Sequence, residues 1–176
     1  MKHEKARAKA ARLRLMAFDV DGVLTDGSLY FTPNGDEIKV FSSLDGHGLK
    51  MLHQAGIEIA IITGRQSRMV ERRAENLGIA HLFQGVQNKR AVMQGLRESL
   101  GLDPEETGYM GDDVVDLPIL RACGFSATVL DGHDFVKRHV DFCASKGGGR
   151  GAVREVCDFI LEAQGKLEAM LDSYLA

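Results

Sequence analysis

The 176-residue chain has few cysteines, no excess of charge of one sign and no long apolar run. Its three cysteines, Cys123, Cys143 and Cys157, lie far apart and form no CxxC pair, so neither a disulfide framework nor a zinc knuckle is expected. The 22 Lys and Arg residues are balanced by 25 Asp and Glu residues, which argues against a general nucleic-acid-binding surface. No apolar stretch approaches the roughly 20 residues that span a bilayer, and no secretory signal is expected. These absences predict a cytoplasmic protein with reduced thiols and with neither a nucleic-acid nor a membrane partner.

The chain has enough apolar residues for one well-packed domain. Hydrophobic residues make up 44% of the sequence, and no repeat or low-complexity segment competes with a globular interpretation. We expect a single domain over residues 15–176. The first fourteen residues contain six Lys or Arg residues and several Ala, a composition compatible with a frayed helix, a basic tail or a weak contact with an acidic partner. Of these we favour a solvated basic tail over residues 1–14.

Short apolar segments alternate with segments of helical periodicity along this domain. Leu49, Leu52 and Ala55 mark one helical face that ends at Gly56, and a last helix runs from Val153 to Leu171. The other predicted helices cover residues 67–77, 90–100 and 117–122, and the predicted strands cover residues 15–20, 57–62, 82–83, 108–110 and 125–129. This alternation predicts a doubly wound, Rossmann-like α/β fold, in which helices cover both faces of a parallel sheet.

Two glycine-containing segments interrupt the alternation. Residues 28–31 and 37–41 flank a Pro-Asn-Gly turn and predict a β-hairpin insertion over residues 28–41. Three consecutive glycines begin at Gly147, and we expect residues 147–176 to form a glycine-rich tail followed by a helix.

Polar side chains follow the predicted strands, where a parallel sheet places its ligands. They are Asp19, Asp21, Thr63, Arg65, Lys89, Asp112, Asp113 and Asp116. Several carboxylates without His or Cys favour Mg²⁺, which prefers oxygen ligands. A metal beside a hydroxyl and an ammonium suits a phosphate group, and an Asp nucleophile with a second carboxyl two residues later can support hydrolysis. The sequence therefore predicts Mg²⁺-dependent phosphoryl transfer at this edge of the sheet.

Four segments resemble, in order, the motifs of haloacid dehalogenase-type phosphatases. They are DVDGVLTDG at residues 19–27, TGR at residues 63–65, Lys89, and GDDVVD at residues 111–116. The chain is most similar to the small, capless 3-deoxy-D-manno-octulosonate 8-phosphate phosphatases, because AIITGR, LFQGVQNK and GGGRGAVREVCDFILEAQGKL match as well. The resemblance covers nearly everything after the basic tail. It implies a fold without a separate cap domain and a phosphomonoesterase of lipopolysaccharide precursor synthesis.

The resemblance also implies a role for each motif residue. Asp19 would be nucleophile and metal ligand, while Asp21 would be general acid and base and would offer its backbone carbonyl to Mg²⁺. Asp112 would complete the protein ligands, and Thr63 and Lys89 would hold the transferring phosphoryl group. Two further carboxylates would lie beside the metal and orient Lys89 or water: Asp113 and Asp116.

In this family the sugar acid meets the loop after the hairpin and several basic residues. The corresponding positions, which we expect to bind substrate together with Asp21 and Lys89, are Ser42, Ser43, Leu44, Asp45, Gly46, Lys50, Arg65 and Arg73. Lys50 stands where arginine is expected, and it keeps the charge but lacks the planar fork that binds a carboxylate through two hydrogen bonds. The family also implies a homotetramer in which four hairpins pack together and a mobile C-terminal tail folds over bound substrate.

Three other functions are compatible with parts of this pattern. A receiver domain uses similar residues, but its phosphorylated Asp lies in the middle of the chain, whereas the candidate nucleophile here follows the first strand. A noncatalytic regulatory domain need not keep the complete motif set. A phosphatase acting on a nine-carbon, sialic-acid-type sugar phosphate would use the same motifs, so the sequence leaves this alternative open.

Overall fold

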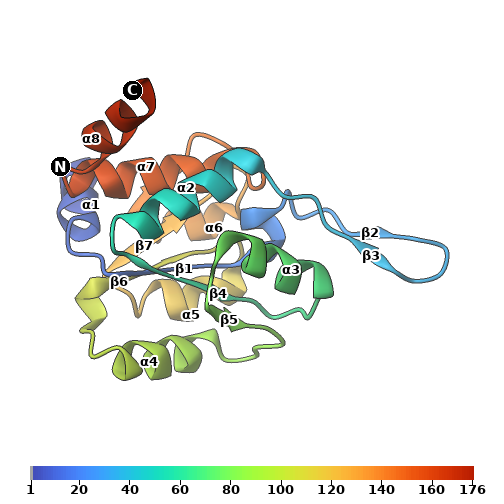
Figure 1. Ribbon diagram of the computed structural model, residues 1–176. Coiled ribbons are helices and arrows are strands. Elements are labelled where there is room, and N and C mark those ends of the chain that lie inside the picture. The colour runs from blue at the N-terminus through green and yellow to red at the C-terminus, as the bar shows by residue number, and fades with distance from the viewer. Residues whose placement is uncertain (1) are drawn as a thin grey trace.

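A six-stranded parallel sheet forms the centre of the structure, a computed structural model that describes residues 2–176 (Figure 1). Every neighbouring pair of strands in it is parallel. In sheet order the strands are β5 (His81–Phe83), β4 (Glu58–Ile62), β1 (Leu15–Phe18), β6 (Thr107–Met110), β7 (Phe125–Thr128) and β8 (Phe142–Cys143). The order reverses between β1 and β6, and in sheets of this kind ligands bind at such a switch point.

Helices cover both faces of the sheet and confirm the predicted fold class. The four that pack on one face are α1 (Lys2–Ala10), α2 (Ser43–Gln54), α3 (Arg68–Leu77) and α7 (Ala152–Ala163). The opposite face is covered by α4 (Lys89–Ser99), α5 (Leu117–Leu120) and α6 (Asp134–Lys137). Within residues 2–176 there is no separate cap domain, and no helix is both long and apolar enough to cross a membrane.

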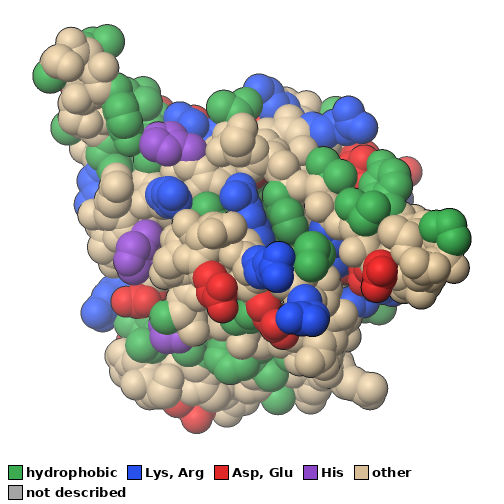
Figure 2. Space-filling view, turned by 45° about the vertical axis from the view of Figure 1, so that its right-hand side comes forward, with side chains coloured by type: hydrophobic (Ala, Val, Ile, Leu, Met, Phe, Trp, Pro, Cys, Tyr) green, Lys and Arg blue, Asp and Glu red, His purple; other side chains and the backbone are tan. Residues whose placement is uncertain are grey.

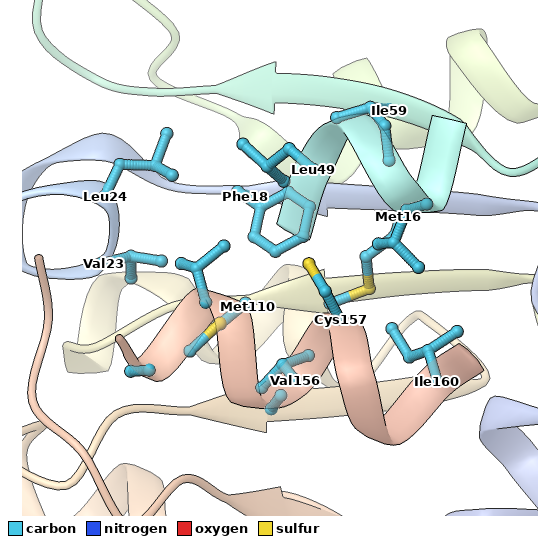
Figure 3. Packing of buried hydrophobic residues seen from close by; sticks show 14 of the residues in the cluster. Met16, Phe18, Val23, Leu24, Leu49, Ile59, Met110, Val156, Cys157 and Ile160 are labelled. Carbon is cyan, nitrogen blue, oxygen red and sulfur yellow. The ribbon is translucent and has the colours of Figure 1, made fainter. Parts of the chain in front are cut away.

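The strands divide their side chains between two hydrophobic cores. Met16 and Phe18 of β1 pack under α2 and α7 with Leu49 and Cys157, whereas the alternate positions of β1 face the other core (Figure 3). The same alternation gives every strand of the sheet centre two buried faces, which explains why these segments are continuously apolar in the sequence.

A β-hairpin projects from the body of the molecule, as predicted (Figure 1). It is formed by β2 (Tyr30–Phe31) and β3 (Glu37–Ile38), which pair in antiparallel register. Gly35 in the turn has a φ of +84°, a conformation that residues with a Cβ rarely adopt.

The N-terminal segment is a helix, so the expectation of a solvated tail over residues 1–14 is wrong for the described residues. Ala6 and Ala10 of α1 are buried against α7, and Leu13 is buried beyond the end of the helix. Arg7 pairs with Glu162 at 3.2 Å and Lys9 with Asp141 at 2.6 Å. The basic residues therefore face outward from a mostly polar helix that packs on the domain through two alanines.

The glycine-rich segment is built into the domain in this structure, and its movement over bound substrate stays a prediction. Gly149 donates its backbone N–H to the carbonyl of Val23 at 3.0 Å, and Gly148 donates to Asp131 Oδ1 at 3.0 Å. The following helix α7 supplies seven buried residues, among them Val153 and Ile160. Because Gly148 and Gly149 have no Cβ, this segment can approach the backbone of residues 22–26 closely.

Two further differences from the predicted elements concern the last third of the chain. The weakly patterned segment after β7 contains α6 and the short edge strand β8. The predicted last helix is divided at Gly165, whose φ is +67°, into α7 and α8 (Leu167–Asp172). A two-residue strand is too short to show a periodicity in the sequence.

Candidate active site

A cleft of about 490 Å³ opens at the carboxyl ends of β1, β4 and β6. It brings together seven of the predicted residues from four separate segments of the chain: Asp19, Asp21, Thr63, Arg65, Lys89, Asp112 and Asp113. Leu29 from the hairpin segment and Val86 and Gln87 before α4 complete part of its wall. Val86 and Gln87 belong to the LFQGVQNK segment and Leu29 to the predicted hairpin, but none of the three was expected to line the site.

Asp19 is fixed at the end of β1 by backbone contacts. Its N–H donates to the carbonyl of Met110 at 3.0 Å, and its Oδ1 accepts a hydrogen bond from the N–H of Val20 at 2.8 Å. The chain then turns through Gly22, whose φ is +87°. A Cβ on Gly22 would overlap the Asp112 carboxylate, so glycine at this position lets the first and last motifs approach each other.

Lys89 lies between two carboxylates at the bottom of the cleft. Its Nζ is 2.9 Å from Asp19 Oδ2 and 2.7 Å from Asp116 Oδ1, and it also donates to the Tyr109 hydroxyl at 3.2 Å. Tyr109 in turn donates to the carbonyl of Ile62 at 3.1 Å. Sequence reasoning missed Tyr109, because its position inside a buried strand is typical of a core residue.

Asp116 is fully buried and has partners for both of its oxygens. Oδ1 faces Lys89 and Tyr109, while Oδ2 accepts hydrogen bonds from the backbone N–H groups of Asp112 at 3.1 Å and Asp113 at 3.3 Å. Oxygens of Asp19, Asp112 and Asp116 lie within 4.8 Å of one another. Asp116 is fully buried and does not line the cleft, whereas Asp19 and Asp112 do, so these two are the carboxylates placed to hold a metal.

The carboxyl groups of Asp19 and Asp112 have strongly raised pKa values. Burial and the Asp116 charge raise the pKa of Asp19 to about 6, although Lys89 opposes this shift. Burial and the charges of Asp19, Asp116 and Asp113 raise the pKa of Asp112 to about 7. Such crowding of negative charge is relieved by a divalent cation, and the all-oxygen donor set fits Mg²⁺.

Asp21 lies at the outer side of the cleft and is held by two cations. The Nζ of Lys39, from the hairpin segment, is 2.6 Å from Asp21 Oδ1 and 2.8 Å from Glu37 Oε1. Arg65 approaches the same two carboxylates, with Nε 3.7 Å from Asp21 Oδ2 and Nη2 3.3 Å from Glu37 Oε1. Sequence reasoning missed Glu37 and Lys39, because only the fold of the hairpin brings them to Asp21.

Thr63 and Lys89 are placed by the ends of their secondary-structure elements. Thr63 follows β4, is buried, and donates its N–H to the carbonyl of Phe83 at 3.0 Å. Lys89 is the first residue of α4, which Asn88 caps by accepting a hydrogen bond from the N–H of Ala91. The two side chains reach the cleft from neighbouring strand ends, as the parallel topology requires.

The remaining predicted substrate-binding residues form a separate group. Residues 43–54 are helical, so the expected loop at Ser42 to Gly46 is wrong: Ser42 caps α2, and Asp45 Oδ1 accepts a hydrogen bond from the N–H of Arg154 at 3.0 Å. Arg73 donates to the carbonyl of Ser42 at 3.1 Å. Within the described chain, the residues of this group do not line the cleft: Ser42, Ser43, Leu44, Asp45, Gly46, Lys50 and Arg73. Their contact with substrate stays a prediction.

This arrangement can support nucleophilic attack on a phosphate ester. Asp19 offers a carboxylate at the floor of the cleft, Lys89 offers a buried positive charge, and Asp21 offers a second carboxylate toward the outer side. An acid or base at the leaving-group side and a cation beside the phosphoryl oxygens are the groups that such a transfer needs.

Comparisons with known proteins agree with this chemistry. Residues 29–124, more than half of the chain, match the family of haloacid dehalogenase-like hydrolases. The 3-deoxy-D-manno-octulosonate 8-phosphate phosphatase KdsC of Escherichia coli strain K12 is 47% identical over 161 residues, which are 92% of this chain and 86% of that protein.

Solved structures give the same result. The 3-deoxy-D-manno-octulosonate 8-phosphate phosphatase of Moraxella catarrhalis, in complex with a magnesium ion, a phosphate ion and KDO, has a TM-score of 0.95 at 43% identity, covering 97% of this chain and 98% of that one. A probable YrbI family phosphatase from Pseudomonas syringae has a TM-score of 0.97 at 47% identity, covering 98% of each chain.

Proposed function

Because the chain belongs to the haloacid dehalogenase-like hydrolases, and within them to the 3-deoxy-D-manno-octulosonate 8-phosphate phosphatases, we propose that its cleft hydrolyses that sugar phosphate to the free sugar acid and inorganic phosphate. The observation that carries the proposal is the position of Lys89 between Asp19 and Asp116, beside the carboxyl of Asp112. This group combines a nucleophile, a phosphate-binding cation and two ligands for Mg²⁺.

The reaction proceeds in two steps that use the residues of the cleft. Asp19 attacks phosphorus, the bond from phosphorus to the ester oxygen breaks, and Asp21 gives that oxygen a proton. Asp21 then takes a proton from a water molecule, which attacks the aspartyl-phosphate and releases phosphate from Asp19. Lys89 and Thr63 hold the phosphoryl oxygens during both steps.

Mg²⁺ would be held by the carboxylates of Asp19 and Asp112 and by the backbone carbonyl of Asp21. When bound, it offsets the negative charge of the phosphoryl group. Asp116 keeps Lys89 and the backbone of Asp112 in position for this, since its two oxygens bond to both. Asp113 is exposed at the edge of the cleft, where it can orient water.

Phosphate release from a panel of sugar phosphates tests the proposal. The eight-carbon 2-keto acid phosphate should be the preferred substrate, and a nine-carbon sialic-acid-type phosphate should react more slowly. Asp19→Ala should abolish turnover while the circular dichroism spectrum stays unchanged, and removal of divalent metal should stop turnover until Mg²⁺ is restored. Turnover by Asp19→Ala, or by metal-free protein, would refute the mechanism.

We further propose that the protein acts as a homotetramer in the cytoplasm, in lipopolysaccharide precursor synthesis. The hairpin exposes Leu29, Tyr30, Phe31, Ile38 and Val40 by between 47% and 62%, more apolar surface than a two-stranded hairpin can cover by itself. Hydrophobic side chains gather on the part of the molecule that projects at the right of Figure 2. The three cysteines are free, in keeping with a reducing compartment.

A further inference from the structure

Four charged side chains form a closed cluster at the outer side of the cleft. Lys39 Nζ lies between Asp21 Oδ1 at 2.6 Å and Glu37 Oε1 at 2.8 Å, and Arg65 Nη2 lies 3.3 Å from the same Glu37 oxygen. The cluster contains two cations and two carboxylates and is therefore electrically neutral. Asp21 is needed for proton transfer, whereas nothing in the proposed reaction needs Glu37.

The two cations are bound very differently. The Lys39 side chain is only 3% exposed and makes two short contacts, so it is committed to the cluster. The Arg65 side chain is 44% exposed, and its contacts with carboxylates are single and longer, at 3.3 Å and 3.7 Å. Its planar fork, which can bind one carboxylate through two parallel hydrogen bonds, is therefore not filled by either partner.

We propose that Glu37 is a specificity-determining residue that competes with the carboxylate of the substrate for Arg65. The inference rests on the proposed function, because it requires a phosphate ester that carries a second anionic group. In the free protein the carboxylate of Glu37 forms an ion pair with Arg65. On binding, the substrate carboxylate takes the fork of Arg65, and Glu37 keeps its contact with Lys39.

The exchange also favours release of the product. Hydrolysis removes the phosphate, but the sugar acid keeps its carboxylate and would remain attached to a free arginine. The Lys39 hydrogen bond and the cations beside Glu37 outweigh its slight burial and lower its pKa, so this carboxylate stays charged and available to return to Arg65. Exposed ion pairs are weak, so each exchange changes the affinity only modestly.

Glu37→Gln tests this competition. Inhibition constants are measured against p-nitrophenyl phosphate hydrolysis for two probes that differ by a carboxylate, 3-phosphoglycerate and glycerol 3-phosphate. Glu37→Gln should lower the inhibition constant of 3-phosphoglycerate by about two- to fivefold, the effect expected for one partly exposed ion pair, and leave that of glycerol 3-phosphate unchanged. The free eight-carbon sugar acid should bind tighter by the same factor, and Glu37→Gln combined with Arg65→Gln should lose the gain.

Asp36→Asn is the matched control. It removes one negative charge from the neighbouring position of the same hairpin, where Asp36 is exposed and the described structure gives it no ion pair. Equal tightening of both probes by Glu37→Gln, the same selectivity from Asp36→Asn, or no inhibition by 3-phosphoglycerate in either protein would overturn the proposal.

The probes separate this proposal from the assignment of the substrate. Selective tightening of 3-phosphoglycerate in a protein that fails to hydrolyse the eight-carbon sugar phosphate would support the role of Glu37 and reject the substrate. Preferred hydrolysis of that sugar phosphate, without selective tightening of 3-phosphoglycerate by Glu37→Gln, would support the substrate and reject the role of Glu37.

Discussion

Asp112 and Asp19 connect the acidity of the cleft to the stability of the protein. Their pKa values of about 7 and about 6 lie above those of carboxyl groups in an unfolded chain, so the folded protein binds more protons between about pH 4 and 7. Without metal, their contribution to stability is therefore greatest at low pH and is lost as the pH rises through this window. Mg²⁺ binds the charged carboxylates, so the increase in melting temperature that it causes should grow from pH 5.5 to pH 8.

Asp112→Asn provides the control for this pH effect. It removes one ligand and one buried charge, and the melting temperature should then depend little on Mg²⁺ at any pH. An Mg²⁺ effect in the unsubstituted protein that is equal at pH 5.5 and pH 8 would contradict the prediction. Differential scanning calorimetry at fixed ionic strength measures the melting temperatures of the unsubstituted protein and of Asp112→Asn with and without Mg²⁺.

Asp116 and Asp113 lie three residues apart in the sequence but differ in their environment, since Asp116 is buried and Asp113 is exposed. In Asp116→Asn an amide nitrogen faces either the two backbone N–H groups or Lys89, since an amide side chain has only one acceptor oxygen. The substitution should cost about 2 kcal/mol of unfolding free energy and lower kcat, because Lys89 loses a counter-ion. Asp113→Asn changes an exposed group and should change stability by less than about 0.5 kcal/mol. Urea unfolding and steady-state kinetics distinguish the two, and equal effects would be the wrong outcome for this interpretation.

Among the site residues, those that directly follow strands were predicted from the sequence. Those brought to the cleft only by tertiary contacts were missed. Asp19, Thr63 and Asp112 could be found because each is adjacent to an apolar strand segment, and strand ends meet in a parallel sheet. Glu37 and Lys39 reach Asp21 only through the path of the hairpin, which local sequence does not encode.

At the scale of elements, the glycine-rich segment before α7 supports the loop that carries Asp21. A Cβ on Gly148 would lie 2.6 Å from the carbonyl carbon of Gly22. The nearest atoms all belong to the backbone, so a shift of the backbone would be needed to make room. Gly148→Ala should therefore destabilise the protein by about 2 kcal/mol or more and reduce kcat by displacing the Asp21 loop. Thermal unfolding and turnover measured on the same preparation give both numbers.

Gly95→Ala is the matched control, because it makes the same chemical change in the exposed middle of α4. A Cβ at Gly95 meets no atom within 4 Å, so alanine should stabilise the protein by about 0.5–1 kcal/mol through helix propensity. Destabilisation by both substitutions would show that Gly148 has no special function.

Elements were predictable where they are long and periodic. The helix over residues 68–77 was expected from its apolar face and from the glycine that ends it, and Gly78 indeed has a φ of +70°. A packed helix α1 was not the favoured prediction, because its buried residues are alanines and its other positions are mostly charged, a composition shared with solvated tails and frayed helices. The two-residue strand β8 gave no signal for a similar reason.

At the scale of the whole molecule, the alternation of strands and helices was enough to predict one doubly wound sheet. The chemistry of the cleft then follows from topology, since residues from β1, β4 and β6 converge only if these strands are parallel neighbours. The residue pattern alone does not predict which surfaces outside the cleft bind other subunits. Exposed apolar residues show no periodicity that identifies what they contact.

The two faces of the hairpin lead to a prediction about assembly. Side chains alternate along the strand, so Glu37 and Lys39 turn toward the cleft while Ile38 and Val40 are 51% and 62% exposed. If hairpins of four subunits pack through this apolar face, Val40→Asp should convert the tetramer to smaller species and reduce activity. Leu175→Asp introduces the same charge at a side chain that is 85% exposed on the C-terminal segment, and it should leave the assembly intact. Sedimentation velocity measures the mass of both variants; a monomeric unsubstituted protein, or an unchanged mass for Val40→Asp, would show that this face packs against no other subunit.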